Sequence, residues 1–475
     1  MAKQYVTIDR WDGGLSDGDI LGSEGSFRFG QGLDYQTNPN AITANLALEK
    51  TSSTTVVTLP KWFAYHTVYD DMYTYDSGGK IYQTTSTGGT VSLLRTVASS
   101  QGQGLEIYGD YLYYTQNSQI GRYGTLTGGA PAFTDNWQTS LSGSTEWRPI
   151  KVFQNLLCVG NGRYLATWDG STWTATKLTF PDGWYVRDLQ VRGDYLAIAV
   201  NDSSDIGATV RGIIFYWDGT SSRYNFFNEV PEAGGISSIQ AMQDKIVIFA
   251  GGSGNIWVDN GTVTKIKRIP HMTRGKTIYV YPGATCNFQG NLFFGVAGGT
   301  DNNVYRGVYS LGSLNVNYPT SLNFSYPIST GTVQTTDILV GSVFPVGARL
   351  YAGWQNSSTY GVDLLSLSNQ QTSVTYESRI ISLPKQSSFD KIKVLFEVLA
   401  SGQTITLKYK NDRATSWTTY DTAISYTSDG AITNKTLNDE IRATDFQIQI
   451  TLAGGATSMP TVFKVIIEYE AEDRL

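Results

Sequence analysis

The stretch IYGDYLY at residues 107–113 decides the fold that this sequence predicts. An apolar residue precedes a tight turn that contains Gly109 and Asp110, and aromatic and aliphatic residues alternate after the turn. Gly and Asp favour tight turns, whereas Tyr and Leu in alternation favour a strand. The same pattern recurs along the chain at residues 68–73, 152–157, 191–197, 242–247, 288–293 and 346–351.

The apolar residue after each turn marks the period of this repeat. The markers are Met72, Leu112, Leu156, Leu196, Ile246, Leu292 and Leu350. They lie about 46 residues apart on average, within the ~40 to ~50 residue period of four-stranded propeller blades. Units of this size cannot bury their faces alone, so they must stack, and radial stacking leaves only short edges. We therefore predict an all-β chain in which residues 61–372 form a β-propeller of about seven blades, with six or eight as alternatives.

A second short pattern lies downstream of the turn in several units. It reads WDGS at 168–171, WDGT at 217–220 and VDNGT at 258–262. Asp-Gly and Asn-Gly between strand-like runs favour a type I′ hairpin turn, because both of its central residues need positive φ. Each unit therefore reads as a small meander of hairpins.

The repeat stops after residue 372, and longer two-residue alternation follows. Apolar residues alternate with other residues at Ile392, Val394, Phe396 and Val398, at Ile405, Leu407 and Tyr409, at Phe446, Ile448, Ile450 and Leu452, and at Phe463, Val465, Ile467 and Tyr469. About six or seven such strands predict a C-terminal β-sandwich over residues 373–475. Residues 1–60 form no blade and predict an extended arm with one or two strands.

The composition excludes several classes of protein. The 475 residues include 50 Gly and 13% aromatic residues, and 16% are charged, against roughly 25% in globular chains. Helical bundles and disordered chains do not have this composition. The net charge of −6 argues against specific nucleic-acid binding. The N-terminus has no apolar segment typical of an export signal, and no run of 18 apolar residues favours membrane insertion.

The inventory of reactive residues favours a protein that is not an enzyme. The only histidines are His66 and His271, and neither has a Cys, His or carboxylate at ligand-like spacing. Cys158 and Cys286 lie in strand-like apolar surroundings and are expected to be buried free thiols. We therefore predict no catalytic, cofactor-binding or metal-binding residues, and no cofactor.

Two alternatives to that prediction rest on carboxylates. Oxygen ligands for calcium could come from Asp12, Asp17 and Asp19, or from Asp202 and Asp205. Neither group follows the EF-hand spacing, and solvated turns explain them better. Propellers also host glycosidases, which need two opposed carboxylates. The single near match to a sialidase box, NDRATSW at 411–417, has Ala414 where the box has Gly and lies outside the predicted propeller.

In its order of segments the whole chain resembles the tail nozzle or tail hub proteins of tailed bacteriophages. The stretches that carry the likeness are WDGGL at 11–15, GLDY at 32–35, YESRII at 376–381, FDKIK at 389–393 and IRATDFQI at 441–448. The resemblance implies a non-enzymatic virion protein that is made in the host cytoplasm and located in the tail. It also implies a ring of identical copies, a hexamer by preference, around the DNA channel. The portal or adaptor and the fibre or spike proteins would be its neighbours.

Two other functions stay open from the sequence. The first is a receptor- or glycan-binding propeller at a tail tip or on a cell surface, since Tyr, Trp, Asn and Ser suit a carbohydrate- or protein-binding rim. The second is a propeller glycosidase. The low charge and the abundance of Tyr, Asn, Gly and Ser favour the structural role, because they suit surfaces that are buried between subunits.

Overall fold

The computed structural model describes most of the chain as strands, in two compact units. The described residues are 3–16, 18, 20, 24–35, 37–52, 56–97, 101–139, 141–142, 147–207, 209–273, 275–301, 303–313, 317–330 and 336–472. Unit 1 comprises Met1–Leu48, Tyr309–Pro327 and Ser366–Leu475, and unit 2 comprises Glu49–Val308 and Ile328–Leu365. Each unit is therefore built from separate stretches of sequence. The three consecutive segments 1–60, 61–372 and 373–475 stay a prediction.

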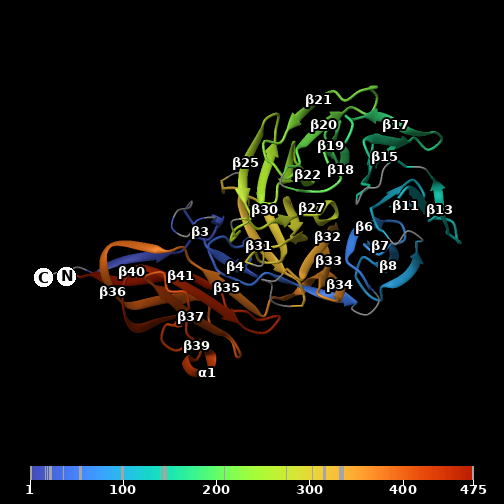
Figure 1. The fold of residues 1–475 in the computed structure, drawn as a ribbon. Helices are drawn as coiled ribbons and strands as arrows, with labels where there is room; N and C mark the ends of the chain where they lie inside the picture. Colours follow the sequence, from blue (N-terminus) through green and yellow to red (C-terminus); the bar gives the residue numbers. More distant parts are fainter. Residues whose placement is uncertain are drawn as a thin grey trace. The chain divides into compact units, whose positions relative to one another are not determined.

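Seven four-stranded sheets form a β-propeller, which confirms the predicted fold class and blade number (Figure 1). Blade 1 contains β6 (Pro60–His66), β7 (Asp71–Asp76), β8 (Lys80–Thr85) and β9 (Ser92–Thr96). Blade 2 contains β10 (Gly104–Tyr108), β11 (Tyr111–Gln116), β12 (Gln119–Gly124) and β13 (Ala132–Gln138). Blade 3 contains β14 (Ile150–Phe153), β15 (Leu156–Asn161), β16 (Tyr164–Trp168) and β17 (Trp173–Thr179). Blades 4 and 5 contain β18 (Tyr185–Arg192), β19 (Tyr195–Asn201), β20 (Gly212–Trp217) and β21 (Phe226–Glu229), then β22 (Ile236–Met242), β23 (Lys245–Ala250), β24 (Asn255–Asp259) and β25 (Val263–Arg268). Blade 6 contains β27 (Thr285–Phe288), β28 (Asn291–Gly295), β30 (Gly307–Gly312) and β31 (Ser321–Pro327), and blade 7 contains β32 (Ile338–Val346), β33 (Arg349–Asn356), β34 (Thr359–Gln370) and β5 (Leu46–Ser52).

The first strand of each blade lies innermost, and these seven strands form a closed ring. Each inner strand contacts the inner strand of the next blade, and β32 of blade 7 contacts β6 of blade 1. The last blade is completed by β5, which comes from the N-terminal part of the chain and pairs with β34. The side chain of Thr51 on β5 donates a hydrogen bond to the backbone oxygen of Val362 at 3.0 Å. The ring is thus closed by strands that lie about 300 residues apart in sequence.

The recurring turn of the sequence is the hairpin between the first and second strands of each blade. In six blades it has two central residues, and the first has positive φ: 58° at Gly109, 46° at Gln154, 54° at Gly193, 56° at Gln243, 49° at Gln289 and 58° at Gly347. Such turns match the twist of the paired strands. In blade 1 the connection is four residues long, because His66 pairs with Asp71.

One marker lies out of register with the others. Six of the seven markers are fully buried, but Leu156 is only half-buried and its neighbour Leu157 takes the buried place. Leu156 pairs with Phe153 directly beside the turn, whereas the other markers lie one residue further along. Because both residues are leucines, the sequence pattern does not show which of them faces the core.

The Asp-Gly and Asn-Gly pairs form longer loops, so the predicted two-residue type I′ turns were wrong there. Trp168 pairs with Trp173, which leaves four residues in the loop, and Asp259 pairs with Val263, which leaves three. The Asp169 carboxylate accepts hydrogen bonds from the backbone N–H groups of Ser171 at 2.8 Å and Thr172 at 2.7 Å. Carboxylate bonds to the following backbone stabilise these loops and explain the position of Asp.

Unit 1 contains a nine-stranded antiparallel sheet in which the long strand β40 (Asn434–Ala453) is central. Its other strands are β1 (Gln4–Ile8), β4 (Phe29–Gln31), β35 (Ser373–Glu377), β36 (Ile381–Phe396), β37 (Thr404–Asn411), β38 (Thr418–Thr419), β39 (Ile424–Ser425) and β41 (Val462–Ala471). The first half of β40 pairs with β36, and its second half pairs with β35 and β37. These strands form one continuous sheet, so a sandwich of two separate sheets stays a prediction.

Details of unit 1 depart from the expected pattern. The first 60 residues contain more strands than the one or two expected, since β2 (Gly14–Leu15), β3 (Ser26–Phe27) and β5 add to β1 and β4. Phe463 and Val398 are exposed, at 44% and 53%, although the alternation had placed them with the buried residues. A register shift between Leu395 and Phe396 moves the buried position of β41 to Val462.

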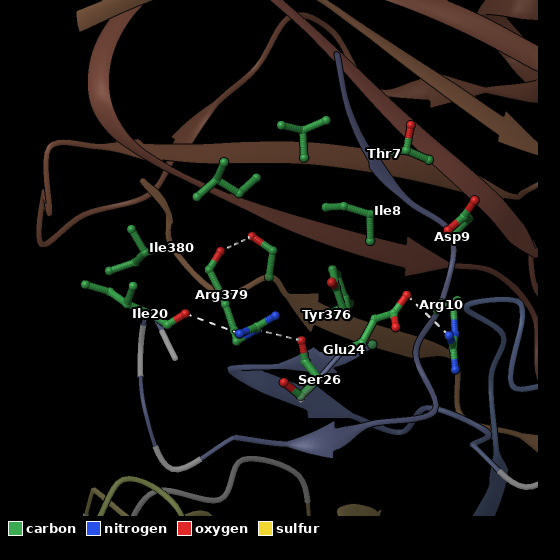
Figure 2. A pocket seen from close by; sticks show the side chains of 14 residues that line it. Thr7, Ile8, Asp9, Arg10, Ile20, Glu24, Ser26, Tyr376, Arg379 and Ile380 are labelled. Carbon is green, nitrogen blue, oxygen red and sulfur yellow. Dashed lines mark hydrogen bonds and ion pairs between the residues drawn. The ribbon is translucent and has the colours of Figure 1, made fainter. Parts of the chain in front are cut away.

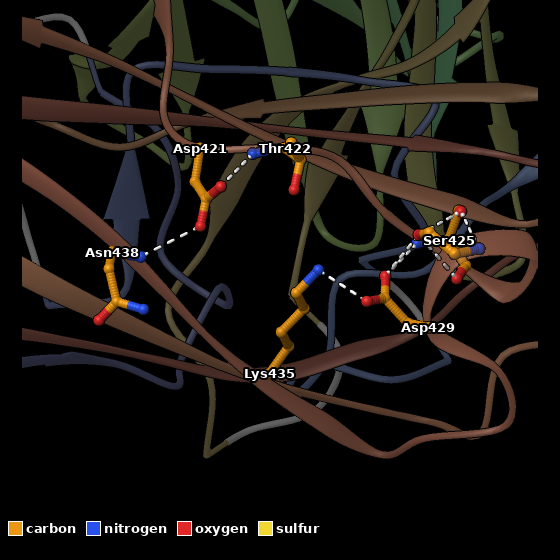
Figure 3. Close-up of polar contacts among 7 residues, drawn as sticks. Asp421, Thr422, Ser425, Asp429, Lys435 and Asn438 are labelled. Atoms are coloured by element: carbon orange, nitrogen blue, oxygen red, sulfur yellow. Dashed lines mark hydrogen bonds and ion pairs between the residues drawn. The ribbon is translucent and has the colours of Figure 1, made fainter.

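A polar cluster holds the loop around α1 (Tyr426–Asp429) in unit 1 (Figure 3). The carboxylate of Asp429 accepts from the ammonium of Lys435 at 2.7 Å and from the backbone N–H of Ser425 at 3.0 Å. Asp421 accepts from the backbone N–H groups of Thr422 at 2.6 Å and Asn438 at 3.2 Å. These bonds lower the pKa of both carboxyl groups. The cluster therefore stabilises the loop.

Candidate functional site

The centre of the propeller contains a cavity of about 320 Å³, which we call the central cavity. All seven inner strands contribute to its wall, together with the short η1 turn (Pro282–Ala284). Blades 2 to 6 contribute the polar side chains Glu106, Lys151, Asp188, Gln190, Gln240, Thr285 and Asn287, interspersed with apolar residues such as Leu105, Ile150 and Leu189. Blades 7 and 1 contribute Val343, Phe344 and Pro345, and Trp62 and Phe63. The cavity thus has one polar wall and one apolar wall.

Several polar groups of the wall hold neighbouring blades together. Asp188 of blade 4 accepts from the Ser238 hydroxyl at 3.1 Å and from the backbone N–H of Ile239 at 2.8 Å, both in blade 5. The Thr285 hydroxyl of blade 6 donates to the amide oxygen of Gln240 in blade 5 at 3.1 Å. Because each bond joins two blades, these side chains stabilise the ring.

Burial changes the acidity of the two carboxylates in this wall. Asp188 is 2% exposed, and burial raises the pKa of its carboxyl to about 6, although three hydrogen bonds oppose the change. Burial also raises the pKa of Glu106, while Lys151 acts in the opposite direction. A neutral carboxyl costs less to bury than a charged one, which is the physical cause of both shifts.

Glu106 and Lys151 form a loose pair across blades 2 and 3. The ammonium nitrogen of Lys151 lies 3.8 Å from a carboxylate oxygen of Glu106, longer than the 2.7–2.9 Å of a charge-assisted hydrogen bond. The side chain of Lys151 is 37% exposed and that of Glu106 is 26% exposed, so the cavity opens to solvent. The pair places one positive and one negative charge in the polar wall.

Among the candidate metal ligands, Asp12 and Asp202 form ion pairs, Asp205 takes part in a turn through its backbone N–H, which donates to the Ser203 hydroxyl at 3.2 Å, and two lie outside the described residues. Asp12 is buried and forms a double contact with Arg10, at 2.8 and 3.3 Å. Asp202 pairs with the side chain of Arg211 at 2.8 Å. Asp17 and Asp19 lie outside the described residues. Across the described part of the chain, no group of three or more His, Cys, Asp or Glu side chains is placed to hold a metal ion.

The histidines and cysteines lie apart from the central cavity except for Cys286. His66 stacks on Tyr69 with ring centroids 5.7 Å apart, and His271 contacts Tyr305 at 5.9 Å. Both cysteines are buried and free, as expected, and burial raises the pKa of the Cys158 thiol to about 12. In the near-sialidase stretch, the side chain of Asp412 accepts from the backbone N–H groups of Thr444 and Asp445, which fixes a turn.

A second pocket, of about 280 Å³, lies in unit 1 beside β1 (Figure 2). The guanidinium of Arg379 donates to the backbone oxygens of Ser26 at 3.1 Å and Ile20 at 3.2 Å. Arg10 forms ion pairs with Asp12 and Glu24. Arg379 therefore joins the N-terminal arm to the residues after β35, and Arg10 joins residues within the arm.

The outer edge of blade 4 carries exposed aromatic residues, which we call the blade-4 edge: Tyr224, Phe226 and Phe227. Phe226 stacks on Tyr216 at 4.5 Å and is 39% exposed, and Phe227 is 51% exposed. β21 is the last strand of its sheet, so its outer side has no strand partner in that sheet. Open edges are usually protected by charged residues, as Lys265 and Lys267 protect the outer strand of blade 5.

No protein-family model matches the sequence, and no curated protein matches it. Solved structures that resemble this chain include the WD40 β-propeller domain of Doa1, with 10% sequence identity and a TM-score of 0.45; the match covers 68% of this chain and 98% of that chain. Another is YCF48 bound to D1 peptide, with 9% identity and a TM-score of 0.47, which covers 68% of this chain and 96% of that chain. The sheet order of this chain itself defines the seven-bladed propeller. Among the described residues, no helix is long and apolar enough to cross a membrane.

Proposed function

We propose that this protein is a non-enzymatic assembly scaffold, and specifically a structural component of a bacteriophage tail. It would form a ring of identical copies around the DNA channel and contact the portal or adaptor and the fibre or spike proteins. Its location would be the tail of the virion, after synthesis in the host cytoplasm. The phage assignment depends on the resemblance in the order of segments. The assembly role depends on an observation of the propeller surface.

The blade-4 edge is that observation. Two phenylalanines on one short strand are exposed on opposite faces of a sheet edge that pairs with no other strand among the described residues. Aromatic residues are enriched at protein interfaces, and charged residues are depleted at the core of such interfaces. We assign a second copy of this chain as the occupant, because a ring of identical copies needs such a surface on each copy.

Any DNA channel in this arrangement would lie between copies. The central cavity, to which all seven inner strands contribute, has a volume of about 320 Å³ and is far too small for a duplex. The net charge of −6 also suits a conduit, since it repels phosphates.

The experiment compares assembly of the wild-type chain with that of a Phe226→Ser, Phe227→Ser double variant. We expect the wild type to form one defined oligomer by size exclusion with light scattering, and the double variant to shift to monomer. Leu93→Ser is the matched control, because Leu93 is 48% exposed on β9, the outer strand of blade 1. Equal loss of the oligomer in the control, or a wild type that stays monomeric at every concentration, would contradict the proposal.

A glycosidase is the enzyme alternative, because Glu106 and Asp188 both lie in the central cavity. Asp188 accepts bonds at both oxygens, from Leu189, Ser238 and Ile239, so it acts as a fixed link between blades. We expect no hydrolysis of aryl glycosides. Hydrolysis by the wild type that disappears in Glu106→Gln would establish the enzyme instead.

A further inference from the structure

The polar wall of the central cavity contains side chains at equivalent positions of four blades. Each lies on the first strand of its blade, two residues before the last residue that pairs with the second strand. The four side chains are those of Glu106, Lys151, Gln190 and Gln240. All four line the same cavity. Because the blades repeat around the ring, equivalent positions lie at one level of the channel. Donors and acceptors are therefore gathered at one height.

The opposite wall is apolar at that level. Phe344 has the equivalent position in blade 7, and its ring lies 6.5 Å from that of Phe63 in blade 1. Both rings belong to the wall of the cavity. A ligand here would meet hydrogen-bonding groups on one side and hydrocarbon on the other, which is the usual construction of a small-molecule site.

Gln190 supplies an amide without a partner. Its side chain is 9% exposed, lies in the wall of the cavity and has no hydrogen-bond partner among the described residues. Neither its amide oxygen nor its amide nitrogen is fully buried, so both are open to water or to a ligand in the cavity. The amide offers both a donor and an acceptor to a bound molecule.

The charges of the wall restrict the ligand further. Glu106 and Lys151 cancel each other, and Asp188 is already bonded to three donors. The wall therefore has no unpaired charge to attract a simple cation or anion. The gap of 3.8 Å between Glu106 and Lys151 suits a hydroxyl group, which can donate to the carboxylate and accept from the ammonium.

We propose that the central cavity binds a neutral polyhydroxylated ligand of the size of one sugar ring. Hydroxyl groups would bond to Glu106, Lys151 and Gln190, and the apolar face of the ring would lie toward Phe344. The volume of about 320 Å³ is at the lower end of ligand pockets, which fits one ring. The source is either a free sugar or the end of a longer glycan. This site goes beyond the assembly role and is independent of it.

The test is saturation-transfer NMR on the full chain with D-glucose, D-galactose, D-mannose and N-acetyl-D-glucosamine. We expect at least one sugar to bind, and Gln190→Leu to weaken that binding at least tenfold. Gln119→Leu is the matched control, because Gln119 lies on β12 outside the cavity. Lys151→Met provides a second variant on a half-exposed side chain, should Gln190→Leu not fold.

The outcomes separate the possibilities. Binding of the free sugar alone identifies a soluble ligand, and tighter binding of a disaccharide that ends in the same sugar identifies a glycan end. If none of the four sugars binds, or if Gln190→Leu and Gln119→Leu bind equally, the proposal is overturned. Binding of glycine or lysine in place of every sugar also overturns it, since a zwitterion would then be the ligand. Gln190→Leu should form the same oligomer as the wild type, so this test and that of assembly are distinguishable.

Discussion

Asp188 shows how single residues hold this ring together. Its carboxylate is almost fully buried, yet it bonds to the backbone and hydroxyl of the next blade. The raised pKa means that the folded chain binds a proton at Asp188 more tightly than the unfolded chain does. Its contribution to stability is thus largest below the ordinary aspartate pKa and is lost as the pH rises through about 6.

We expect the stability advantage of the wild type over Asp188→Asn to fall by about 2 kcal/mol between pH 4 and pH 7, from a shift of about two pKa units. Urea unfolding of both proteins across that range measures it. Asp218 is the control of opposite sign, because hydrogen bonds from Ser221 and Asn225 lower its pKa. The stability advantage of the wild type over Asp218→Asn should be lost as the pH falls. A pH-independent difference for Asp188 would contradict the burial argument.

Substitution of a hairpin glycine tests the geometry of the turn. Gly347 has a φ of 58°, and no heavy atom lies within 4 Å of an added Cβ, so only the backbone conformation disfavours a side chain. We expect Gly347→Ala to destabilise the fold by about 1 kcal/mol. Gly129→Ala is the control, because Gly129 has equal space and no positive φ. Equal effects of both changes on the urea midpoint would refute the assigned turn.

At the scale of elements, β5 is the strand on which closure of the propeller depends. It supplies the outer strand of blade 7, where the Thr51 hydroxyl bonds to β34 and Lys50 lies 4.6 Å from the ring of Trp354. Other blades take their four strands from one stretch of sequence, so their outer strands do not join distant parts of the chain.

We expect replacement of Leu46–Ser52 by a seven-residue Gly-Ser segment to lower the thermal midpoint of the whole propeller. The same kind of replacement at Ser92–Thr96, the outer strand of blade 1, should cause only local fraying. Hydrogen exchange measures both, since global opening exposes the amides of every inner strand and local opening does not. Protection of the inner strands that is unchanged after loss of β5 would contradict the closure.

The sequence predicted those elements that depend on local chemistry. The hairpins of the repeat were predictable because positive φ requires Gly or a few polar residues in the turn, as at Gly109 and Gln154. The pairing of β5 with β34 was not, because about 300 residues separate them and seven residues carry little pattern. The central cavity was missed for the same reason. Glu106, Lys151 and Gln190 each read as ordinary strand residues, and only ring closure brings them together.

At the scale of the whole molecule, composition and surface lead to the same proposal. The low content of charged residues and the many aromatic residues serve packing within the blades. The rings of Tyr75 and Tyr114, for example, meet edge to face with their centroids 6.0 Å apart. Where aromatics stay exposed on an open edge, as Phe226 and Phe227 do, an interface with another copy explains them. An acidic chain also suits a ring through which DNA passes.

The mass and image of the purified wild-type chain test the central claim most directly. Light scattering after size exclusion, followed by negative-stain imaging of the same fraction, gives the copy number and the presence of an opening. The proposal predicts one closed ring of identical copies with a hole wide enough for duplex DNA, outside the propellers themselves. A monomer at every concentration, or open filaments of variable length, would contradict it.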